Sequence, residues 1–525
     1  MALSYVSVER DQLFLVPPSM RDWLPEGHLV WFVLDVVERV DTSALHARHP
    51  NDGVGRRAYD PEVLLALLIY AYCGGIRSSR RIERLCEVDV AFRVICAGHA
   101  PDHTTIARFR QGYDEVAQQV FVDVLELCAM AGLVEVGLVA VDGTKVTASA
   151  SRKANRTRAH IEAEVKAMFD EAAEVDAQED QLLGGARGDE LPAELADPRR
   201  RGARLAAALE ELQRRREARE AEERVVRDAQ RERWEEHKRR AVAEGRLPHG
   251  RPPEDVELAE AEAVLATQEA RAAERARRRA AAEAKAAAEG RKMRGPKPDH
   301  DNHRDLGKAR QRVERARARA SAGASRADPD SDEDRVNTTD PASRLMKGPH
   351  SWVQGYNGQA AVNTNGVVLA AYVTQNGNDV GQCVPMMAAT RANLDAAGVN
   401  APIDVMIFDA GYLSEDNLTA NGPDRLIATA KAWKLRKEEP TQRPAPPSAS
   451  PIEAMDHRLR TPEGSATYAK RQHTVEPVFG DVKDNRGLRR FSRRGLRAVD
   501  AEWKLTMTVH NALKLFRQRH GLATT

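Results

Sequence analysis

Aromatic residues are scarce in this chain of 525 residues, and long apolar runs are missing. Phe, Trp and Tyr make up 5% of the residues, charged residues make up 30%, and the mean hydropathy is -0.55. This composition indicates solvated helices or disorder beside ordinary cores. The run nearest to a membrane span, Val63 to Ile76, is shorter than the ~20 apolar residues that a span requires, and Gly74 and Gly75 interrupt it. We therefore expect a buried core helix there and no membrane partner.

Cysteine is rare as well. The five cysteines show no C-x-x-C spacing and lie in apolar surroundings, which favours reduced thiols over a zinc site or a disulfide framework. The first residues include Glu9, Arg10 and Asp11, where a secretory signal needs an apolar run. The sequence therefore predicts a cytoplasmic protein.

Net charge is close to zero, at +1, so the chain as a whole gives no reason to expect a polyanionic partner. The charge is nevertheless unevenly distributed. Residues 271–320 hold about 17 basic and 7 acidic residues, and residues 470–519 hold about 13 and 5. These two basic blocks make nucleic acid a reasonable partner.

The length of the chain exceeds what one hydrophobic core usually serves, so several domains are expected. Residues 1–135 carry apolar residues at helical spacing, which predicts an all-helical N-terminal domain. In residues 136–153 an apolar β-branched run ends on Asp142 and predicts a buried strand.

Residues 154–335 differ in composition from the rest of the chain. They are rich in Ala, Glu and Arg and lack a sustained apolar stripe, so we expect a charged helical or partly disordered insertion. Its arginines either follow DNA, mediate assembly or are merely solvated, and the sequence does not separate these roles.

Strand patterns return in residues 336–434. An Asn-Gly turn in residues 364–366 lies between two strand-like runs and predicts a hairpin. A further apolar run, Ile403 to Phe408, ends on Asp409. These runs predict strands that join the one before the insertion.

Residues 435–465 are rich in proline and predict a linker. Residues 466–520 are typical of a helix, an arginine-rich turn and a second helix. The order of these segments predicts an α/β domain with a mixed β-sheet flanked by helices, interrupted by the charged insertion and preceded by the helical domain.

Asp142 and Asp409 hold equivalent positions, because each closes an apolar strand and is followed by a small residue, Gly143 or Ala410. At the tips of neighbouring strands their side chains would point into one cleft. A lone aspartate after a strand is more often a turn residue or a helix cap, so the pattern alone leaves that alternative open.

A third carboxylate, Glu476, lies near a predicted helix start. Thr474 is a suitable cap, and Pro477 is tolerated because the first helical turn needs no backbone donor. Lys483 follows seven residues after Glu476, about 10 Å along a helix axis. Three carboxylates suit hard divalent ions that leave positions open for phosphate and water, as in two-ion phosphoryl transfer.

Three segments resemble the catalytic blocks of bacterial DDE insertion-sequence transposases, whose core is RNase H-like. In order, these segments run from Ala140 to Lys145, from Phe408 to Tyr412 and from Val475 to Gly480. Gly355 to Ala360 and several N-terminal segments share the resemblance, which covers most of the chain outside the insertion. The resemblance implies an RNase H-like catalytic core.

The same resemblance implies roles for the three carboxylates. Asp142, Asp409 and Glu476 are the expected catalytic residues and metal ligands, holding two ions of Mg²⁺ or Mn²⁺, and no organic cofactor is expected. Both metals accept oxygen ligands, so the sequence does not choose between them.

Many such transposases carry a Tyr-x2-Arg-x3-Glu-x6-Lys pattern around the last carboxylate. Tyr468, Arg471, Glu476 and Lys483 match it, except that the gap between Arg471 and Glu476 is one residue longer. This departure leaves the role of Arg471 open, with Lys470 as the alternative.

Two further regions are expected to hold DNA. The basic run that follows Glu476 favours a phosphate-binding loop, with a surface ion-pair cluster as the alternative. The predicted helix from Asp102 to Arg110 suits a DNA groove, although an ordinary helical bundle is nearly as good an interpretation. The residues predicted to contact DNA are Tyr468, Arg471, Lys483, Arg486, Arg489, Arg490, Arg493, Arg494, Thr104, Thr105 and Arg108.

These observations predict a metal-dependent DNA transposase that binds the ends of a mobile element, cleaves them and joins the 3′-hydroxyl ends to target DNA. Its partner is double-stranded DNA, both element ends and target, on which a homo-oligomer is expected in the nucleoid. Two alternatives stay open: a metal-dependent nuclease without strand transfer, and a catalytically decayed DNA-binding protein or repressor.

Overall fold

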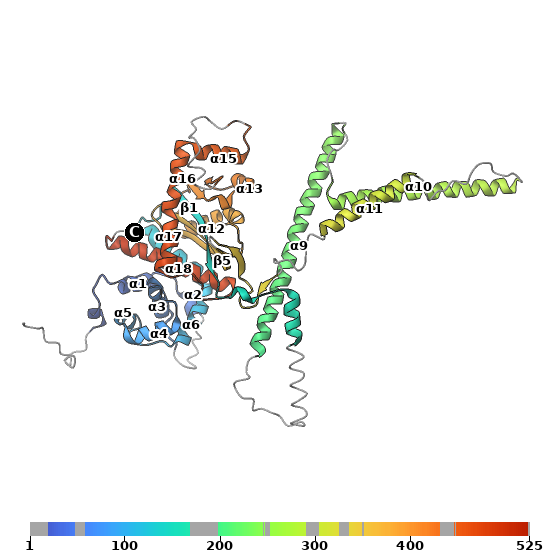
Figure 1. The fold of residues 1–525 in the computed structure, drawn as a ribbon. Helices are drawn as coiled ribbons and strands as arrows, with labels where there is room; N and C mark the ends of the chain where they lie inside the picture. The colour runs from blue at the N-terminus through green and yellow to red at the C-terminus, as the bar shows by residue number, and fades with distance from the viewer. Residues whose placement is uncertain are drawn as a thin grey trace, which may run out of the picture. The chain divides into compact units, whose positions relative to one another are not determined.

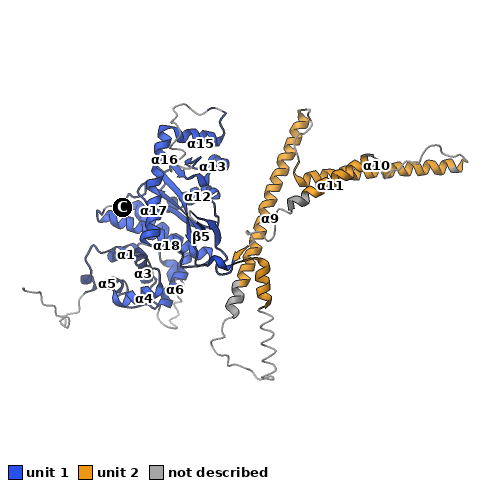
Figure 2. Ribbon diagram, in the orientation of Figure 1, with its two compact units in different colours: residues 1–155, 337–525 blue, residues 156–336 orange. Residues whose placement is uncertain are grey.

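The structure is a computed structural model, and it describes residues 19–47, 58–167, 198–244, 246, 252–289, 304–324, 335–348, 351–430, 446 and 448–522. The chain forms two compact units, residues 1–155 with 337–525, and residues 156–336 (Figure 2). The predicted insertion, residues 154–335, begins two residues before the second unit and ends one residue before its end.

The N-terminal part of the first unit is all-helical within the residues described, as predicted. Its longer helices are α1 (Leu29–Glu38), α3 (Pro61–Cys73), α4 (Ser79–Val88), α6 (His103–Gly112) and α7 (Ala117–Met130), with the short α2 (Ser43–His46) and α5 (Val90–Ile95) between them (Figure 1). Helix α3 begins at Pro61 because the Asp60 side chain caps it, and ten of its residues are buried. The apolar run that starts at Val63 is thus a core helix.

A mixed sheet forms the centre of the first unit. Its strands are β1 (Leu138–Thr147), β4 (Arg344–Lys347), β5 (Trp352–Asn363), β6 (Val368–Thr374), β7 (Val405–Phe408) and β8 (Asp424–Ile427). Strand β1 lies antiparallel to β5 on one side and parallel to β7 on the other, and β7 lies parallel to β8. Strands β4 and β6 both pair with β5. The predicted mixed sheet is confirmed.

The predicted hairpin is the pair β5 and β6. Its turn residue Gly366 has a φ of +74°, a backbone region that glycine adopts without a Cβ clash. The Asn363 side chain accepts hydrogen bonds from the backbone N–H groups of Asn365 and Val367 and so closes the turn.

Strand β1 is longer than predicted. The apolar run ends at Asp142, but the strand continues to Thr147 because its ladder with β5 runs from Val139 paired with Asn363 to Thr147 paired with Gly355. The expectation that Asp142 lies at a strand tip was therefore wrong. Asp409, by contrast, directly follows the last residue of β7, as predicted.

The last helix, α18 (Leu496–Arg519), connects the sheet to the helical domain, since it contacts β6, α3 and α7. Trp503, on this helix, is fully buried, and its ring would lie 2.9 Å from a Cβ at Gly358. Trp503 and His510 both belong to the core. Helix α12 (Cys383–Ala396) contacts β5, β6 and α7.

The predicted linker, residues 435–465, is partly helical. Residues 431–445 and 447 lie outside the described residues, but α15 (Pro451–Arg460) and α16 (Pro462–Thr474) begin inside the predicted range. Helix α15 begins where it does because Ser450 and Glu453 form a capping box and Pro451 occupies the first turn. The turn chemistry of this segment thus overrides its proline-rich composition.

In the second unit, long charged helices dominate the described residues: α9 (Pro198–Ala243), α10 (Glu254–Ala288) and α11 (Arg304–Ala324). Helices α10 and α11 pack together through Ala261, Val313 and Ala316. Four arginines of these helices form ion pairs: Arg278 with Glu274, Arg279 with Glu283, Arg317 with Glu262 and Arg319 with Glu257. For these four, the pairing favours a structural over a DNA-tracking role.

All five cysteines are free and buried, in agreement with the expectation of reduced thiols. Within the described residues, no helix combines the length and apolarity needed to cross a bilayer.

The β1 backbone lies close to Gly355 of the paired strand β5, and this close approach can be tested by substitution. A Cβ at Gly355 would lie 2.2 Å from the Val146 carbonyl oxygen, which belongs to the backbone and cannot move aside. We expect Gly355→Ala to lower the free energy of unfolding by about 1–3 kcal/mol, measured by urea denaturation. Gly480→Ala is the matched control, because nothing lies within 4 Å of its added Cβ and it is helical. Equal stability of the two variants would contradict the prediction.

Candidate active site

The candidate site lies at an interruption in the edge of β1. Strand β7 covers this edge only from Leu138 to Ala140, and Arg490 bridges to it again at Thr147. Among the described residues no strand pairs with the edge in between. Asp142 lies in this interval, and Asp409 follows β7 where that strand ends. Crevices at the carboxyl ends of parallel strands are common ligand sites in α/β sheets.

Asp142 and Asp409 are largely buried carboxylates, and their charges influence each other. Burial raises the pKa of Asp142 to about 6, the Arg471 charge acts against this, and the Asp409 charge adds to it. Burial likewise raises the pKa of Asp409, again against the effect of Arg471. Their acceptor atoms are oriented by backbone donors, since Asp142 Oδ1 and Asp409 Oδ1 each accept from a nearby glycine N–H at 2.8 Å. The structure thus brings the two predicted aspartates together.

Arg471, on α16, is the main cation beside this pair. Its Nη2 lies 2.8 Å from Asp142 Oδ2, and its side chain is only 13% exposed. Burial opposes its charged form, but the charges of Asp142, Tyr468, Asp409 and Glu476 outweigh burial and raise its pKa. The longer spacing before Glu476 therefore does not remove Arg471 from the site, and Lys470 is not needed in its place.

The other members of the sequence pattern approach from α16 and the segment after it. Tyr468 is close enough for the charges of Asp409 and Asp142 to add to the effect of burial in raising its pKa. Glu476 is the first residue of α17 (Glu476–Gly480) and is exposed. Lys483 lies in a π-helical turn (Asp481–Asn485), and its Nζ donates to Thr144 Oγ1. Arg471 and Lys483 thus contact β1 directly, and Tyr468 lies near its aspartate, whereas Glu476 stays exposed at the start of its helix.

Thr474 does not cap the helix of Glu476, contrary to the prediction. It is the last residue of α16, and its hydroxyl donates to the Lys470 carbonyl at 2.8 Å. Only Val475 separates the two helices. Val475, rather than Thr474, therefore occupies the N-cap position of the helix that begins at Glu476.

The donor set of the site fits a hard divalent cation in part. Asp142 and Asp409 supply carboxylate oxygens of the kind that Mg²⁺ and Mn²⁺ prefer. Within the described residues, however, no three His, Cys, Asp or Glu side chains converge closely enough to hold a metal ion. Arg471 occupies one oxygen of Asp142, and Glu476 stands apart on its helix end.

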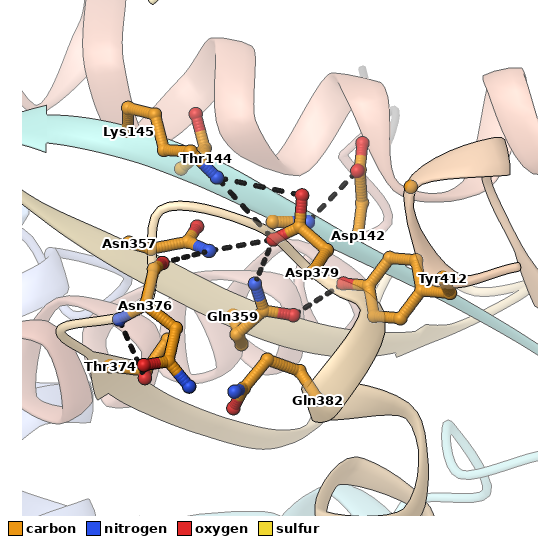
Figure 3. Close-up of polar contacts among 12 residues, drawn as sticks. Asp142, Thr144, Lys145, Asn357, Gln359, Thr374, Asn376, Asp379, Gln382 and Tyr412 are labelled. Carbon is orange, nitrogen blue, oxygen red and sulfur yellow. Dashed lines mark hydrogen bonds and ion pairs between the residues drawn. The ribbon is translucent and has the colours of Figure 1, made fainter. Parts of the chain in front are cut away.

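A third, largely buried carboxylate, Asp379, was not identified from the sequence (Figure 3). Its Oδ1 accepts from Asn357 Nδ2 at 2.6 Å and from Gln359 Nε2 at 2.7 Å, and Lys145 Nζ lies 3.4 Å away. It precedes a short 3-10 helix (Val380–Gln382) in a loop, without the strand-tip pattern that identified Asp142 and Asp409. The only signal in the sequence was the stretch of amides on β5.

The arginines after Glu476 mostly make structural contacts. Arg493 pairs with Asp114 of the helical domain, with Nη2 2.9 Å from Oδ2, and Arg486 pairs with Asp481. Arg490 and Arg494 donate to the carbonyls of Ala148 and Ser149 just after β1. Arg489 pairs with Asp484 and is the most exposed of these pairs, at 75%. This loop therefore attaches the helical domain to the end of β1, and its contact with DNA stays a prediction.

The predicted DNA-contacting residues of the helical domain lie on α6. The Asp102 side chain caps this helix by accepting from the backbone N–H groups of Thr104 and Thr105, and Thr105 Oγ1 donates to Asp102 as well. Arg108 is exposed. The cap is confirmed, and the surface is available to a partner, but the structure brings none of these residues to the carboxylate site.

Tyr412, three residues after Asp409, packs in the core. It is fully buried, and its hydroxyl donates to Gln359 Oε1.

Two segments of the chain match protein families. Residues 18–112 match the family described as Transposase domain (DUF772), and residues 436–516 match the family described as Transposase DDE domain. The first segment spans most of the helical domain, and the second contains Tyr468, Arg471, Glu476 and Lys483. Comparisons with curated proteins and with solved structures found no match.

The raised pKa of Asp142 gives a prediction for stability without divalent ions. Between pH 4 and pH 6 the folded chain holds a proton that the unfolded chain releases, so the free energy of unfolding falls as the pH rises through this window. Asp142→Asn should remove on the order of 2 kcal/mol of this decrease, measured by urea denaturation in EDTA. Asp395→Asn, at an exposed ion pair with Arg391, should retain it. Parallel pH profiles for wild type and Asp142→Asn would refute this.

Proposed function

We propose that this chain, whose two family matches support an insertion-sequence DDE transposase, cleaves DNA at the ends of a mobile element and joins the freed 3′-hydroxyl ends to target DNA. Asp142 and Asp409 are the central residues of the site, and Glu476 is the third member of the triad. Both reactions are in-line displacements at phosphorus, so one site can serve both.

The observation that carries this proposal is the pair of largely buried aspartates, one on β1 and one at the end of the adjacent parallel strand β7. Burying two mutually repelling carboxylates costs stability, since charged groups lose their hydration and each disfavours the charge of the other. Core packing alone gives no reason to retain such a pair. Groups that are perturbed in this way cluster at functional sites. The mixed sheet around β1 is consistent with an RNase H-like core.

A divalent ion, Mg²⁺ or Mn²⁺, would be held by Asp142 and Asp409, with Glu476 completing the set. When bound, such an ion supplies Lewis-acid stabilisation of charge on the phosphate and lowers the pKa of a bound water. Arg471 compensates the charge of Asp142 when the ion is absent. The exposed position of Glu476 at a helix start leaves this residue free to approach.

The remaining residues would bind and orient the DNA strand. Lys483 and Arg471 approach β1 from the same segment as Glu476 and place positive charge beside the carboxylates. Lysine and arginine are the usual partners of phosphate oxygens, arginine as a planar fork and lysine as a point charge. Double-stranded DNA, and a homo-oligomer that processes two ends together, are the partners that this reaction requires.

The decisive assay uses a labelled duplex that carries the ends of the element encoding this chain, incubated with Mg²⁺. Cleavage and joining are scored separately for wild type, Asp142→Asn and Asp409→Asn. We expect both products from wild type, and at least a hundredfold loss in both variants, as is usual when a charge-stabilising group of an active site is removed. Asp416→Asn, on the exposed surface of α13 (Glu415–Thr419), should match wild type.

Supplying a precleaved end separates this proposal from its rivals. Joining of that end to a target requires strand transfer, whereas cleavage without joining would favour a nuclease. Binding of the duplex with neither reaction would favour a decayed DNA-binding protein.

A further inference from the structure

Asp379 is held by more donors than a loop carboxylate usually has. Asn357 and Gln359 donate to its Oδ1 from β5, where they lie two residues apart and therefore on one face of the sheet. Lys145 and Gly143 are their register partners on β1, so both face the same side. Figure 3 shows the two amides and Lys145 directed at the Asp379 carboxylate.

The orientation of both amides is fixed by their partners. Asn357 Nδ2 also donates to the Asn376 carbonyl at 3.2 Å, so its amino group faces two acceptors. Gln359 donates to Asp379 and accepts from the Tyr412 hydroxyl. A Cβ at Gly143 would lie 2.2 Å from Gln359 Nε2 and 2.6 Å from Asp379 Oδ1, so the network packs directly against the residue after Asp142.

Asn357 Oδ1 is left without a hydrogen-bond partner among the described residues, although Asn357 is fully buried. An unpaired buried carbonyl costs free energy, so the position is maintained against that cost. A Cβ at Gly143 would lie 3.0 Å from this oxygen as well. The unsatisfied atom thus lies on the same side of β1 as Lys145 and Asp379.

Lys145 is held more loosely than the amides. Its Nζ lies 3.4 and 3.5 Å from the two Asp379 oxygens, and the two side chains are 14% and 18% exposed. An ammonium group has three donors, and within the part of the chain that the structure describes Lys145 donates to Asp379 alone. Donors therefore remain available to a phosphate. The Lys145 charge also reaches Asp409, whose pKa is raised by burial and lowered in turn by Arg471 and by Lys145.

We propose that Asp379 is a positioning residue that holds the Lys145 ammonium on the Asp409 side of the site, where Lys145 contacts a phosphate of the bound DNA strand. The two amides of β5 fix the carboxylate, and the carboxylate in turn restricts the long lysine side chain. This inference rests on the proposed function, because it takes DNA as the ligand. Asp379 itself does not touch the substrate.

The first test is a footprint that needs no turnover. Wild-type protein in EDTA is treated with an amine-acetylating reagent, with and without the element-end duplex, and labelling of each lysine is read by mass spectrometry. We expect DNA to slow the labelling of Lys145 severalfold and to leave Lys347, exposed on β4, unchanged. In Asp379→Asn without DNA, Lys145 should label faster than in wild type. Equal labelling of Lys145 with and without DNA would overturn the proposal.

The second test measures single-turnover cleavage at saturating DNA for Asp379→Asn, Lys145→Met and the double variant. Misplacement of a positioned group by about 1 Å can cost a hundredfold, so each single variant should lose about tenfold to a hundredfold in rate. If Asp379 acts through Lys145, the double variant is no slower than Lys145→Met. Additive losses, or a severalfold increase in the Mg²⁺ concentration needed by Asp379→Asn, would overturn the proposal.

The outcomes of these tests distinguish an error in this inference from an error in the proposed function. Protection of Lys145 by DNA in a wild-type protein that neither cleaves nor joins would contradict the proposed function alone. An unprotected Lys145 in a protein that cleaves DNA would contradict this inference alone.

Discussion

The ladder between β1 and β5 determines where most of the site residues lie. Its nine paired positions place Lys145 opposite Asn357 and Gly143 opposite Gln359, which sets these side chains on one face of the sheet. Asp142 and Thr144 alternate with them and face Arg471 and Lys483 on the other side. A slip of one residue would exchange the two sets, so the ladder register is as important to the site as the residues themselves.

Charge compensation is the second constraint, and it comes from distant parts of the chain. Three acidic groups, Asp142, Asp409 and Asp379, lie close enough to affect one another. Arg471 and Lys145 compensate them from two sides of β1, the first from a helix near the C-terminus and the second from the strand itself. The site therefore has no large excess of either charge before substrate binds. Binding of a phosphate or a divalent ion would therefore change a charge balance that already exists in the free protein.

Sequence patterns predicted those features that depend on neighbouring residues. Asp409 was placed correctly because the short apolar run before it and the strand β7 both end at Phe408. The extension of β1 past Asp142 was missed because it depends on β5, across the insertion. Asp379 was missed for the same reason, since its importance comes from Asn357, Gln359 and Lys145, which only the fold brings to it.

The helical part of the molecule shows the same contrast between features set by neighbouring residues and features set by distant segments. Helix α3 and the cap at Asp102 follow from local signals and were predicted. The arginine-rich loop was expected to bind DNA phosphates, yet several of its side chains bind carboxylates and carbonyls of distant segments. Composition identifies a basic segment, but only tertiary structure tells which of its charges are already paired.

The chain leaves the first unit and returns to it through two short neighbouring strands, β2 (Asn155–Arg156) and β3 (Val336–Asn337). The Thr338 N–H also donates to the Ala154 carbonyl at 2.9 Å. Backbone pairing therefore holds the two ends of the intervening segment next to each other. Little more than a turn would be needed to connect β2 directly to β3. The segment between them can therefore be lengthened, shortened or replaced during evolution without disrupting the sheet of the first unit.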